Sequence, residues 1–456
     1  MTDADLIKHL WTHKTQDHPS WRDEDLMIER GQGVYVWNRK GRRLFDAYAG
    51  LAVVNVGHGR AEIADAVRDQ VAKLAYYPTT RQFSNLPAAQ LAARLAELTP
   101  GDLKYTLFAV SGSEANERSM QIARVYWRKV GRPRKYKVIS LTYGYHGATL
   151  ATLALCGQPD LVRAYEPFAW DGFRKVAAPY PMWDRGSGTD EDLVRRCADR
   201  LAGVIREEDP ETVAAVILEP CLSSGGCIIP PLGWLERVRD VCDELDVLMI
   251  ADEVITGFGR TGKWFGVNHE GVVPDLMSVA KGITSGYIPL SASVAREKLA
   301  DAFPEESREE NVHPNTYCGH PVACAAALAN IAILERENLV RNSEAMGARL
   351  HAAIESRVRD CPIVGEVRSR GLMVALDFAD PGRRDRPLDR NLVASLNTRA
   401  LDKGYIAMAK DSVLRLAPPF CIIAGEVDEL AQLVGETVRD LQDEATRSSR
   451  GQVAAA

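Results

Sequence analysis

Two charged side chains stand where apolar segments of the sequence end, and their types suggest chemistry on an amine. Lys281 follows the apolar run LMSVA, and Asp252 closes the run VLMIAD. Both groups are costly to bury without a partner. A lysine amine with little room to hydrate forms a Schiff base readily and can carry protons. Asp252 could pair with a structural lysine or arginine, or it could keep a heterocyclic nitrogen protonated, as an aspartate does for a pyridine ring that accepts electrons.

A candidate phosphate site lies at the start of a predicted helix. Ser111 and Glu114 have the spacing of a capping box, apolar residues recur at helical spacing after them, and Gly131 supplies a stop. An ordinary capped helix would show the same pattern. In a functional interpretation, Ser111, Gly112 and Ser113 present backbone N–H groups and hydroxyls at the positive end of the helix, which suits a phosphate.

Two other segments contain residues that could bind a phosphate or a planar ring. The segment GFGRTGK (257–263) nearly matches a nucleotide-binding loop, but Trp264 replaces the Ser or Thr that would bind magnesium, so we reject a nucleotide triphosphatase. In YHG, Tyr145 or His146 offers a flat surface to a planar ring, although such a pair also serves ordinary packing. A phosphate cradle, an aromatic surface, a buried aspartate and a lysine together are the components of a pyridoxal phosphate site.

The elements that must position these residues alternate between two patterns. Short apolar and β-branched runs at 105–110, 137–140, 213–219, 247–253 and 276–280 are separated by helical patterns. This alternation predicts parallel strands in an α/β domain with helices on both faces. Ligands of such sheets bind beyond the carboxyl ends of the strands, where each of these runs gives way to glycine, serine or charged residues.

The length of 456 residues exceeds what one hydrophobic core usually organises. We expect residues 66–335 to form a large cofactor-binding domain. Residues 1–65 and 336–456 are expected to form a smaller α+β domain, and the polar tail after about residue 445 is expected to be mobile.

Composition narrows the class of protein. The formal charge of −6 with no basic tract argues against nucleic-acid and membrane-surface partners. The polar N-terminus lacks the apolar core of a signal peptide, and no apolar run has the length of a membrane span. The nine cysteines are scattered, without the spacing of a metal site, and are expected to be reduced. We therefore expect a cytoplasmic enzyme without a metal.

The sequence resembles the class III, or ω-amino acid, aminotransferases from about Gly31 to about Glu429. The resemblance implies an aspartate aminotransferase-like fold (pyridoxal phosphate fold type I), with a mostly parallel central sheet in the large domain and a smaller α+β domain. It rests on the following segments: AGLAVVNVGHG (49–59), SGSEANE (111–117), YHG (145–147), ILEP (217–220), ADEVITGFGRTGK (251–263), SVAKGITSGYIPLSA (278–292), NTYCGHPVACAAAL (315–328) and LRLAPPF (414–420).

The resemblance assigns roles to individual residues. It implies that Lys281 carries pyridoxal phosphate as an internal aldimine and that Asp252 pairs with the pyridine nitrogen. In the family, the threonine of the NTY segment reaches the cofactor phosphate of the neighbouring subunit, so Thr316 implies a homodimer with shared sites, which could assemble into a tetramer. The catalytic candidates are Lys281, Asp252 and Tyr145, and the cofactor-binding candidates are Ser111, Gly112, Ser113, Tyr145, His146, Glu219, Asp252, Val254, Lys281 and Thr316.

Substrate residues are predicted from the same resemblance. Arg415 occupies the place of an arginine that binds a substrate carboxylate in the ornithine, γ-aminobutyrate and dialkylglycine members, although a surface arginine would also suit a strand. Ser224 stands where a glutamate screens that arginine in the ornithine and γ-aminobutyrate members. Ala52 replaces the tryptophan usual in amine–pyruvate members and should enlarge the pocket. Arg81 could bind a carboxylate or sulfonate, or it could be a solvated loop charge.

These features favour ping-pong amino transfer from an ω-amino acid or amine, such as taurine or β-alanine, to pyruvate. A dialkylglycine decarboxylase is an alternative, but such enzymes carry glutamine where this chain has Leu51, and tryptophan at the position of Tyr145. An aminotransferase that uses 2-oxoglutarate also stays open. A non-catalytic binding protein with this fold is a further alternative, although it would have no physical need for Lys281.

Overall fold

The computed structural model describes residue 9 and residues 27–454, except 81, 169–170, 185, 187, 304–311 and 313–314. The chain divides into two compact units. One comprises Met1–Arg60 and Asn342–Ala456, and the other comprises Ala61–Arg341. The expected domain limits were 65/66 and 335/336.

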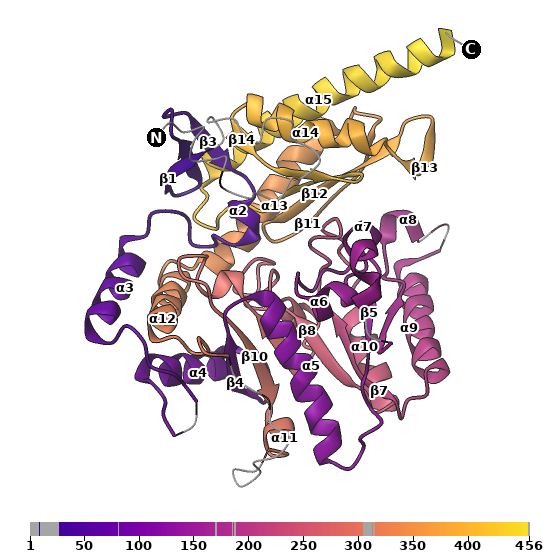
Figure 1. Ribbon diagram of the computed structural model, residues 1–456. Coiled ribbons are helices and arrows are strands. Elements are labelled where there is room, and N and C mark those ends of the chain that lie inside the picture. The colour runs from indigo at the N-terminus through magenta and orange to yellow at the C-terminus, as the bar shows by residue number, and fades with distance from the viewer. Residues whose placement is uncertain are drawn as a thin grey trace. The chain divides into compact units, whose positions relative to one another are not determined.

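A seven-stranded sheet forms the centre of the unit Ala61–Arg341 (Figure 1). Its strand order is β4-β10-β9-β8-β7-β5-β6. Neighbours from β6 to β9 are parallel, while β10 is antiparallel to both β9 and β4. The mostly parallel sheet expected from the sequence is therefore confirmed, whereas β6 and β10 were not predicted. The strands are β4 (Leu103–Ala109), β5 (Lys137–Leu141), β6 (Phe173–Val176), β7 (Val213–Leu218), β8 (Leu248–Asp252), β9 (Leu276–Val279) and β10 (Ser291–Arg296).

Helices cover this sheet, and Figure 1 shows α5 (Gly112–Lys129) crossing in front of it. The apolar side chains of Ile122, Ala123 and Trp127 on α5 share a core cluster with Leu248 and Ile250 of β8. Because both faces of the central strands are buried, β7 and β8 have near-continuous apolar sequences. The other α-helices of this unit are α3 (Ala61–Lys73), α4 (Leu86–Leu98), α6 (Leu150–Leu155), α7 (Pro159–Val162), α8 (Pro181–Asp184), α9 (Asp190–Glu207), α10 (Trp234–Glu244), α11 (Glu297–Ala300) and α12 (Pro321–Arg336).

A group of buried hydroxyls joins α5 to the sheet. Ser119 Oγ lies 2.7 Å from Ser278 Oγ on β9 and 2.7 Å from Ser293 Oγ on β10. All three side chains are buried. These contacts explain why the sequence of β10, SASVAR, is not a continuous apolar run although the strand is buried. Its small polar side chains form hydrogen bonds inside the protein.

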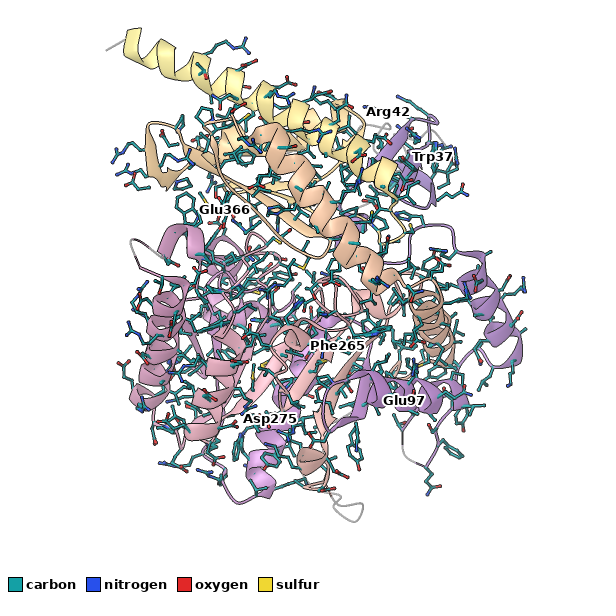
Figure 2. The ribbon with its side chains drawn as sticks, turned by 180° about the vertical axis from the view of Figure 1, so that it is seen from behind. Trp37, Arg42, Glu97, Phe265, Asp275 and Glu366 are labelled. Carbon is teal, nitrogen blue, oxygen red and sulfur yellow. The ribbon has the colours of Figure 1, made fainter. Side chains whose placement is uncertain are left out.

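Opposite ends of the strands have different chemistry. Asp275, which precedes β9 and is labelled in Figure 2, is fully buried and accepts hydrogen bonds from Arg239 Nη1 (2.8 Å) and from the N–H of Met249 (2.9 Å). Arg239 and Lys298 hold the pKa of this carboxyl below its usual range despite its burial. At the other end, Asp252 closes β8 and Lys281 follows β9. Asp252 and Lys281 therefore lie at the carboxyl ends of their strands, and Asp275 lies at the amino end of β9.

The second unit contains two sheets. One has the order β1-β2-β3-β14 and the other β11-β12-β16-β15, with β13 paired to β12. The strands are β1 (Ile28–Gln32), β2 (Tyr35–Asn38), β3 (Arg43–Asp46), β11 (Val364–Arg370), β12 (Met373–Asp380), β13 (Arg383–Pro387), β14 (Tyr405–Ile406), β15 (Met408–Lys410) and β16 (Val413–Leu416). The helices are α2 (Ala49–Ala52), α13 (Leu339–Val358), α14 (Arg390–Asp402) and α15 (Ala424–Ala454).

The last helix, α15, continues through the segment whose mobility was expected from its composition. Its backbone is helical to Ala454, so the expected mobility stays a prediction. Among the helices that the structure describes, none is both long and apolar enough to cross a membrane.

Candidate active site

Asp252 is held in one orientation at the end of β8. Its side chain is 3% exposed, and its Oδ2 accepts a hydrogen bond from Asn116 Nδ2 (2.7 Å) and lies 2.8 Å from His146 Nδ1. Its Oδ1 accepts the N–H of Val254 (3.1 Å). Among the described residues, the side-chain hydrogen-bond partners of this buried carboxylate are thus His146 and Asn116, and no lysine or arginine pairs with it.

Asn116 is a site residue that sequence reasoning missed. Besides Asp252, its Nδ2 donates to the carbonyl oxygen of His146 (2.7 Å), so one amide ties α5 to both the strand end and the YHG loop. The side chain is buried. Its position one helical turn after Gly112 was the one available signal, because residues four apart lie on the same face of a helix.

The N-terminus of α5 is capped differently from the expected capping box. Ser111 Oγ accepts the N–H of Glu114 (3.2 Å) as predicted, but the Glu114 carboxylate accepts the N–H of Val110 (2.9 Å) instead of that of Ser111. Within the described part of the chain, the N–H groups of Gly112 and Ser113 have no hydrogen-bond acceptor. Two donors thus remain at the positive end of this helix.

Close backbone approaches bring the candidate segments together. A Cβ atom on Gly112 would lie 2.9 Å from Val254 Cγ1 and 3.6 Å from Ala280 Cβ, so the helix start, Val254 and the residue before Lys281 are in contact range. A Cβ atom on Gly147, whose φ is 143°, would lie 2.5 Å from Ser113 Oγ. Any larger residue at either glycine would therefore have to displace its neighbours.

Tyr145 and Glu219 are linked beside Asp252. The Glu219 carboxylate accepts the N–H of Tyr145 (2.9 Å) and the N–H of Ser223 (2.9 Å). Burial, with the charge of Asp252, raises the pKa of Glu219 above its ordinary value. Burial also raises the pKa of the half-buried Tyr145 phenol. Glu219 therefore anchors the loop that carries Tyr145.

Lys281 begins a short 3₁₀ turn, η4 (Lys281–Ile283), and has an unusual backbone conformation. Its φ is 45°, in the left-handed region that residues other than glycine seldom adopt. Such strained residues persist only where the surrounding structure fixes them, and they cluster at active sites.

The remaining predicted residues have the following places. Thr316 is exposed, and its carbonyl oxygen accepts a hydrogen bond from Tyr76 Oη (2.5 Å). Arg81 lies outside the described residues.

In the other unit, Arg415 on β16 is 6% exposed with its guanidinium 5.9 Å from the Tyr48 ring, so the alternative of a surface arginine is wrong. Leu51 is exposed and Ala52 is buried in α2, where Ala52 has a φ of 56°.

Comparisons with known proteins define the class. The sequence pattern of the family "Aminotransferase class-III" matches residues 19–438. The chain is 37% identical to a diaminobutyrate–2-oxoglutarate transaminase of Halomonas elongata over 99% of this chain and 98% of that one. It is 34% identical to a hypotaurine/taurine–pyruvate aminotransferase of Paracoccus denitrificans over 93% of this chain and 94% of that one.

Solved structures agree with this assignment. A thermostable (S)-enantioselective ω-transaminase from Thermomicrobium roseum superposes with a TM-score of 0.90 and 38% identity, covering 96% of this chain and 97% of that one. The fold is therefore that of pyridoxal phosphate enzymes of fold type I. The chain belongs to the class III aminotransferases, and it is an enzyme of the transaminase type.

Aminotransferases of this class use pyridoxal phosphate, and the residues present fit it. Gly112 and Ser113 offer two N–H donors at a helix start for an anionic phosphate. The buried carboxylate of Asp252 would suit a protonated ring nitrogen, and the amine of Lys281 would suit the cofactor aldehyde. The close approach of Gly112 to Val254 places the phosphate donors beside a small apolar side chain that a ring can contact.

Proposed function

We propose that this aminotransferase moves an amino group from an ω-amino acid or amine, such as taurine or β-alanine, to pyruvate by a ping-pong mechanism. The observation that carries amino transfer is the buried Asp252 carboxylate, which His146 and Asn116 hold at the edge of the sheet where Lys281 follows β9. A carboxylate fixed in this way has little freedom to reorganise when a positive charge forms beside it.

Each residue near this edge has a proposed task. Gly112 and Ser113 would bind the phosphate, Tyr145 and Val254 would contact the ring, and Asp252 would keep the ring nitrogen protonated. When bound, pyridoxal phosphate supplies an aldehyde that takes up the amino group and a ring that accepts the electron pair left on the donor carbon.

The proposed task of Lys281 is proton transfer. Its Nζ would accept the proton from the donor carbon in the first half-reaction and return a proton to the carbon of the keto acid in the second. Glu219 would support this chemistry indirectly, because it anchors the backbone of Tyr145 beside Asp252. Thr316 would bind the cofactor phosphate of the neighbouring subunit.

The proposed substrates follow from the acid-binding residues. Arg415 has a planar guanidinium suited to the carboxylate of a donor or of pyruvate, and Ser224 stands where a glutamate screens the corresponding arginine in the ornithine and γ-aminobutyrate members. Ala52 and Leu51 would shape the pocket for the rest of the donor. Arg81 would be a second arginine, besides Arg415, for the acid group of an ω-amino acid or for a sulfonate. The named activity of the Paracoccus relative supports this substrate class.

A second candidate acceptor is 2-oxoglutarate. The Halomonas relative, which matches nearly the whole chain, is named for that acceptor. Both keto acids carry a carboxylate next to the keto group, so the proposed role of Arg415 serves either one.

We also propose a homodimer, and an exposed group of aromatic side chains supports it. Tyr76 packs edge-to-face on Tyr317 (6.0 Å between centroids) and Tyr77 on Phe83 (5.4 Å), and all four are exposed. Exposed apolar groups of this kind mark interaction surfaces. Thr316 adjoins this group through Tyr76. A Tyr317→Arg protein should sediment as a monomer, whereas an unchanged dimer would exclude this surface.

A panel of amine donors measured against pyruvate and 2-oxoglutarate tests the proposed function. We expect taurine or β-alanine with pyruvate to give the highest kcat/KM, and parallel lines in double-reciprocal plots. Fastest turnover with 2-oxoglutarate would favour the second candidate. Absence of turnover with every pair, in protein that binds the cofactor, would support a non-catalytic role. An Arg81→Ala enzyme with full activity on acidic donors would exclude a role of Arg81 in binding the acid group of the donor.

A further inference from the structure

A buried asparagine on α12 holds the two peptide carbonyls that follow Lys281. Asn330 Nδ2 donates to the carbonyl oxygen of Gly282 (2.9 Å) and to that of Ile283 (3.0 Å). Asn330, Gly282 and Ile283 are all buried, so water has little access to these groups. The side-chain amide therefore provides both carbonyls with partners inside the protein.

The turn that Asn330 holds is strained. Lys281 has a φ of 45°, and Ser285, four residues later, has a φ of 52°. Locally, the turn is closed by hydrogen bonds from the N–H of Ile283 to the carbonyl of Ala280 (3.0 Å) and from the N–H of Thr284 to that of Lys281 (3.2 Å). A left-handed residue other than glycine is kept only when contacts from outside the turn fix it as well. Asn330 supplies such a contact from a distant helix.

The chemistry of Asn330 differs from that of its neighbours on α12. The other buried side chains on this helix that the structure describes are apolar, such as Ala326, Ile331 and Leu334. Asn330 Oδ1 is buried without a hydrogen-bond partner among the described residues. An unpaired buried oxygen destabilises a fold, so an apolar side chain of the same shape would serve helix packing better. What an apolar side chain cannot do is bind the carbonyls of the Lys281 turn.

We propose that Asn330 is a positioning residue for the transamination: it fixes the turn from which the Lys281 side chain projects and so orients Nζ toward the cofactor aldehyde. This inference rests on the proposed role of Lys281. Loss of both hydrogen bonds allows the turn to relax, and an error of about 1 Å in the position of a reacting atom lowers rates by up to about a hundredfold.

The test measures how fast Lys281 captures the cofactor, independently of turnover. Protein freed of cofactor is mixed with pyridoxal phosphate, and samples are quenched with borohydride at intervals. The peptide that carries the modified lysine is then quantified by mass spectrometry. Lys281 Nζ forms a bond to the aldehyde carbon with loss of water, and hydride from borohydride then makes the bond permanent. The variants are Asn330→Leu, which keeps the shape, and Asn330→Ala, which makes no steric demand.

A matched control separates positioning from stability. Thr99 Oγ1 is buried between the carbonyl oxygens of Leu95 (2.8 Å) and Leu103 (2.6 Å), so Thr99→Val also removes a buried donor in this unit without touching the turn. We expect both Asn330 variants to capture the cofactor at least about tenfold more slowly, with a shifted pH dependence of the rate. Thr99→Val should lower the thermal midpoint without slowing capture.

The possible failures are distinguishable with a Lys281→Ala protein. Capture that proceeds in Lys281→Ala as in the unaltered protein would overturn the proposed role of Lys281, and this inference with it. Capture that requires Lys281 but proceeds at the unaltered rate in both Asn330 variants would overturn the inference alone. Slowed capture in Thr99→Val as well as in the Asn330 variants would also overturn it, because stability alone would then explain the effect.

Discussion

His146 Nδ1 lies 2.8 Å from Asp252 Oδ2, and the side chains are 0% and 3% exposed. The same oxygen accepts a hydrogen bond from Asn116 Nδ2, so His146 and Asn116, from different segments, both donate to one carboxylate oxygen. Hydrogen bonds to a carboxylate are short and strong, so these two contacts hold its direction. The ability of Asp252 to meet a ring nitrogen therefore depends on His146 as well as on Asp252 itself.

Replacement of His146 by alanine should weaken cofactor binding. The loss of a hydrogen bond to a charged group costs roughly 1.5–3 kcal/mol, which corresponds to about a tenfold to hundredfold rise in Kd. Titration of cofactor-free protein with pyridoxal phosphate, followed by absorbance, measures this change. His351→Ala removes a partly exposed histidine of the other unit and should leave Kd unchanged. Equal affinities of His146→Ala and the unaltered protein would show that Asp252 needs no such support.

Replacement of Arg415 by leucine should divide the donors into two groups. Donors with a carboxylate should lose about a hundredfold in the rate constant of the first half-reaction, because a charged hydrogen bond of roughly 3 kcal/mol disappears. Amines without an acid group should react nearly as before. Stopped-flow absorbance of the donor half-reaction gives both values, and Arg384→Leu, on the exposed strand β13, is the control. An equal loss for both groups would mean that Arg415 supports the structure and does not select substrates.

The buried Glu253 should make stability depend on pH. Burial raises the pKa of Glu253 from 4.5 to about 7, although the N–H groups of Gly266 (2.8 Å) and Val267 (2.8 Å) donate to it. Because the folded protein holds this proton more tightly than the unfolded chain, the contribution is complete below about pH 4.5 and is lost as the pH rises through 7.

Comparison with a Glu253→Gln protein isolates this contribution. The glutamine variant should be less stable than the unaltered protein, because its amide nitrogen faces an N–H donor. The difference in thermal midpoint between the two proteins should narrow between pH 5 and pH 8, because only the unaltered protein loses the contribution of the Glu253 proton. The narrowing should correspond to roughly 3 kcal/mol. Glu97→Gln, an exposed control labelled in Figure 2, should show a constant gap. A gap for Glu253→Gln that widened with pH would reverse the sign of the proposed titration.

The buried Lys135 should stabilise the large unit without taking part in catalysis. Its Nζ donates to the carbonyl oxygens of Pro210 (2.9 Å), Val213 (3.2 Å) and Asp246 (2.5 Å), and its side chain is fully buried. Lys135→Met leaves these carbonyls unsatisfied and should cost roughly 3 kcal/mol.

Thermal unfolding and turnover together check the role of Lys135. The midpoint of Lys135→Met should fall by several degrees while kcat/KM at a permissive temperature stays unchanged. Lys104→Met, at an exposed position on β4, should leave both unchanged. A Lys135→Met protein as stable as the unaltered one would mean that water satisfies the three carbonyls.

The sequence indicated the strand ends but not the contacts between distant segments. Asp252 and Lys281 could be proposed because an apolar run ends at each of them, and this pattern is local. Asn330 was not predicted because its partners lie nearly fifty positions earlier and its helix is alanine-rich and mostly apolar. Strand β10 escaped because its buried serines are satisfied by Ser119 and Ser278, which only the folded chain brings together. Periodicity reports which face is apolar, and it cannot report which polar groups meet across a fold.

Borohydride trapping of the cofactor-loaded protein, followed by peptide mass spectrometry, tests whether the cofactor is attached to Lys281. The pyridoxal phosphate label should be found on Lys281 and should disappear in Lys281→Ala, while a Lys263→Ala control should keep it. A label on another lysine, or one that persists in Lys281→Ala, would contradict the attachment of the cofactor to Lys281.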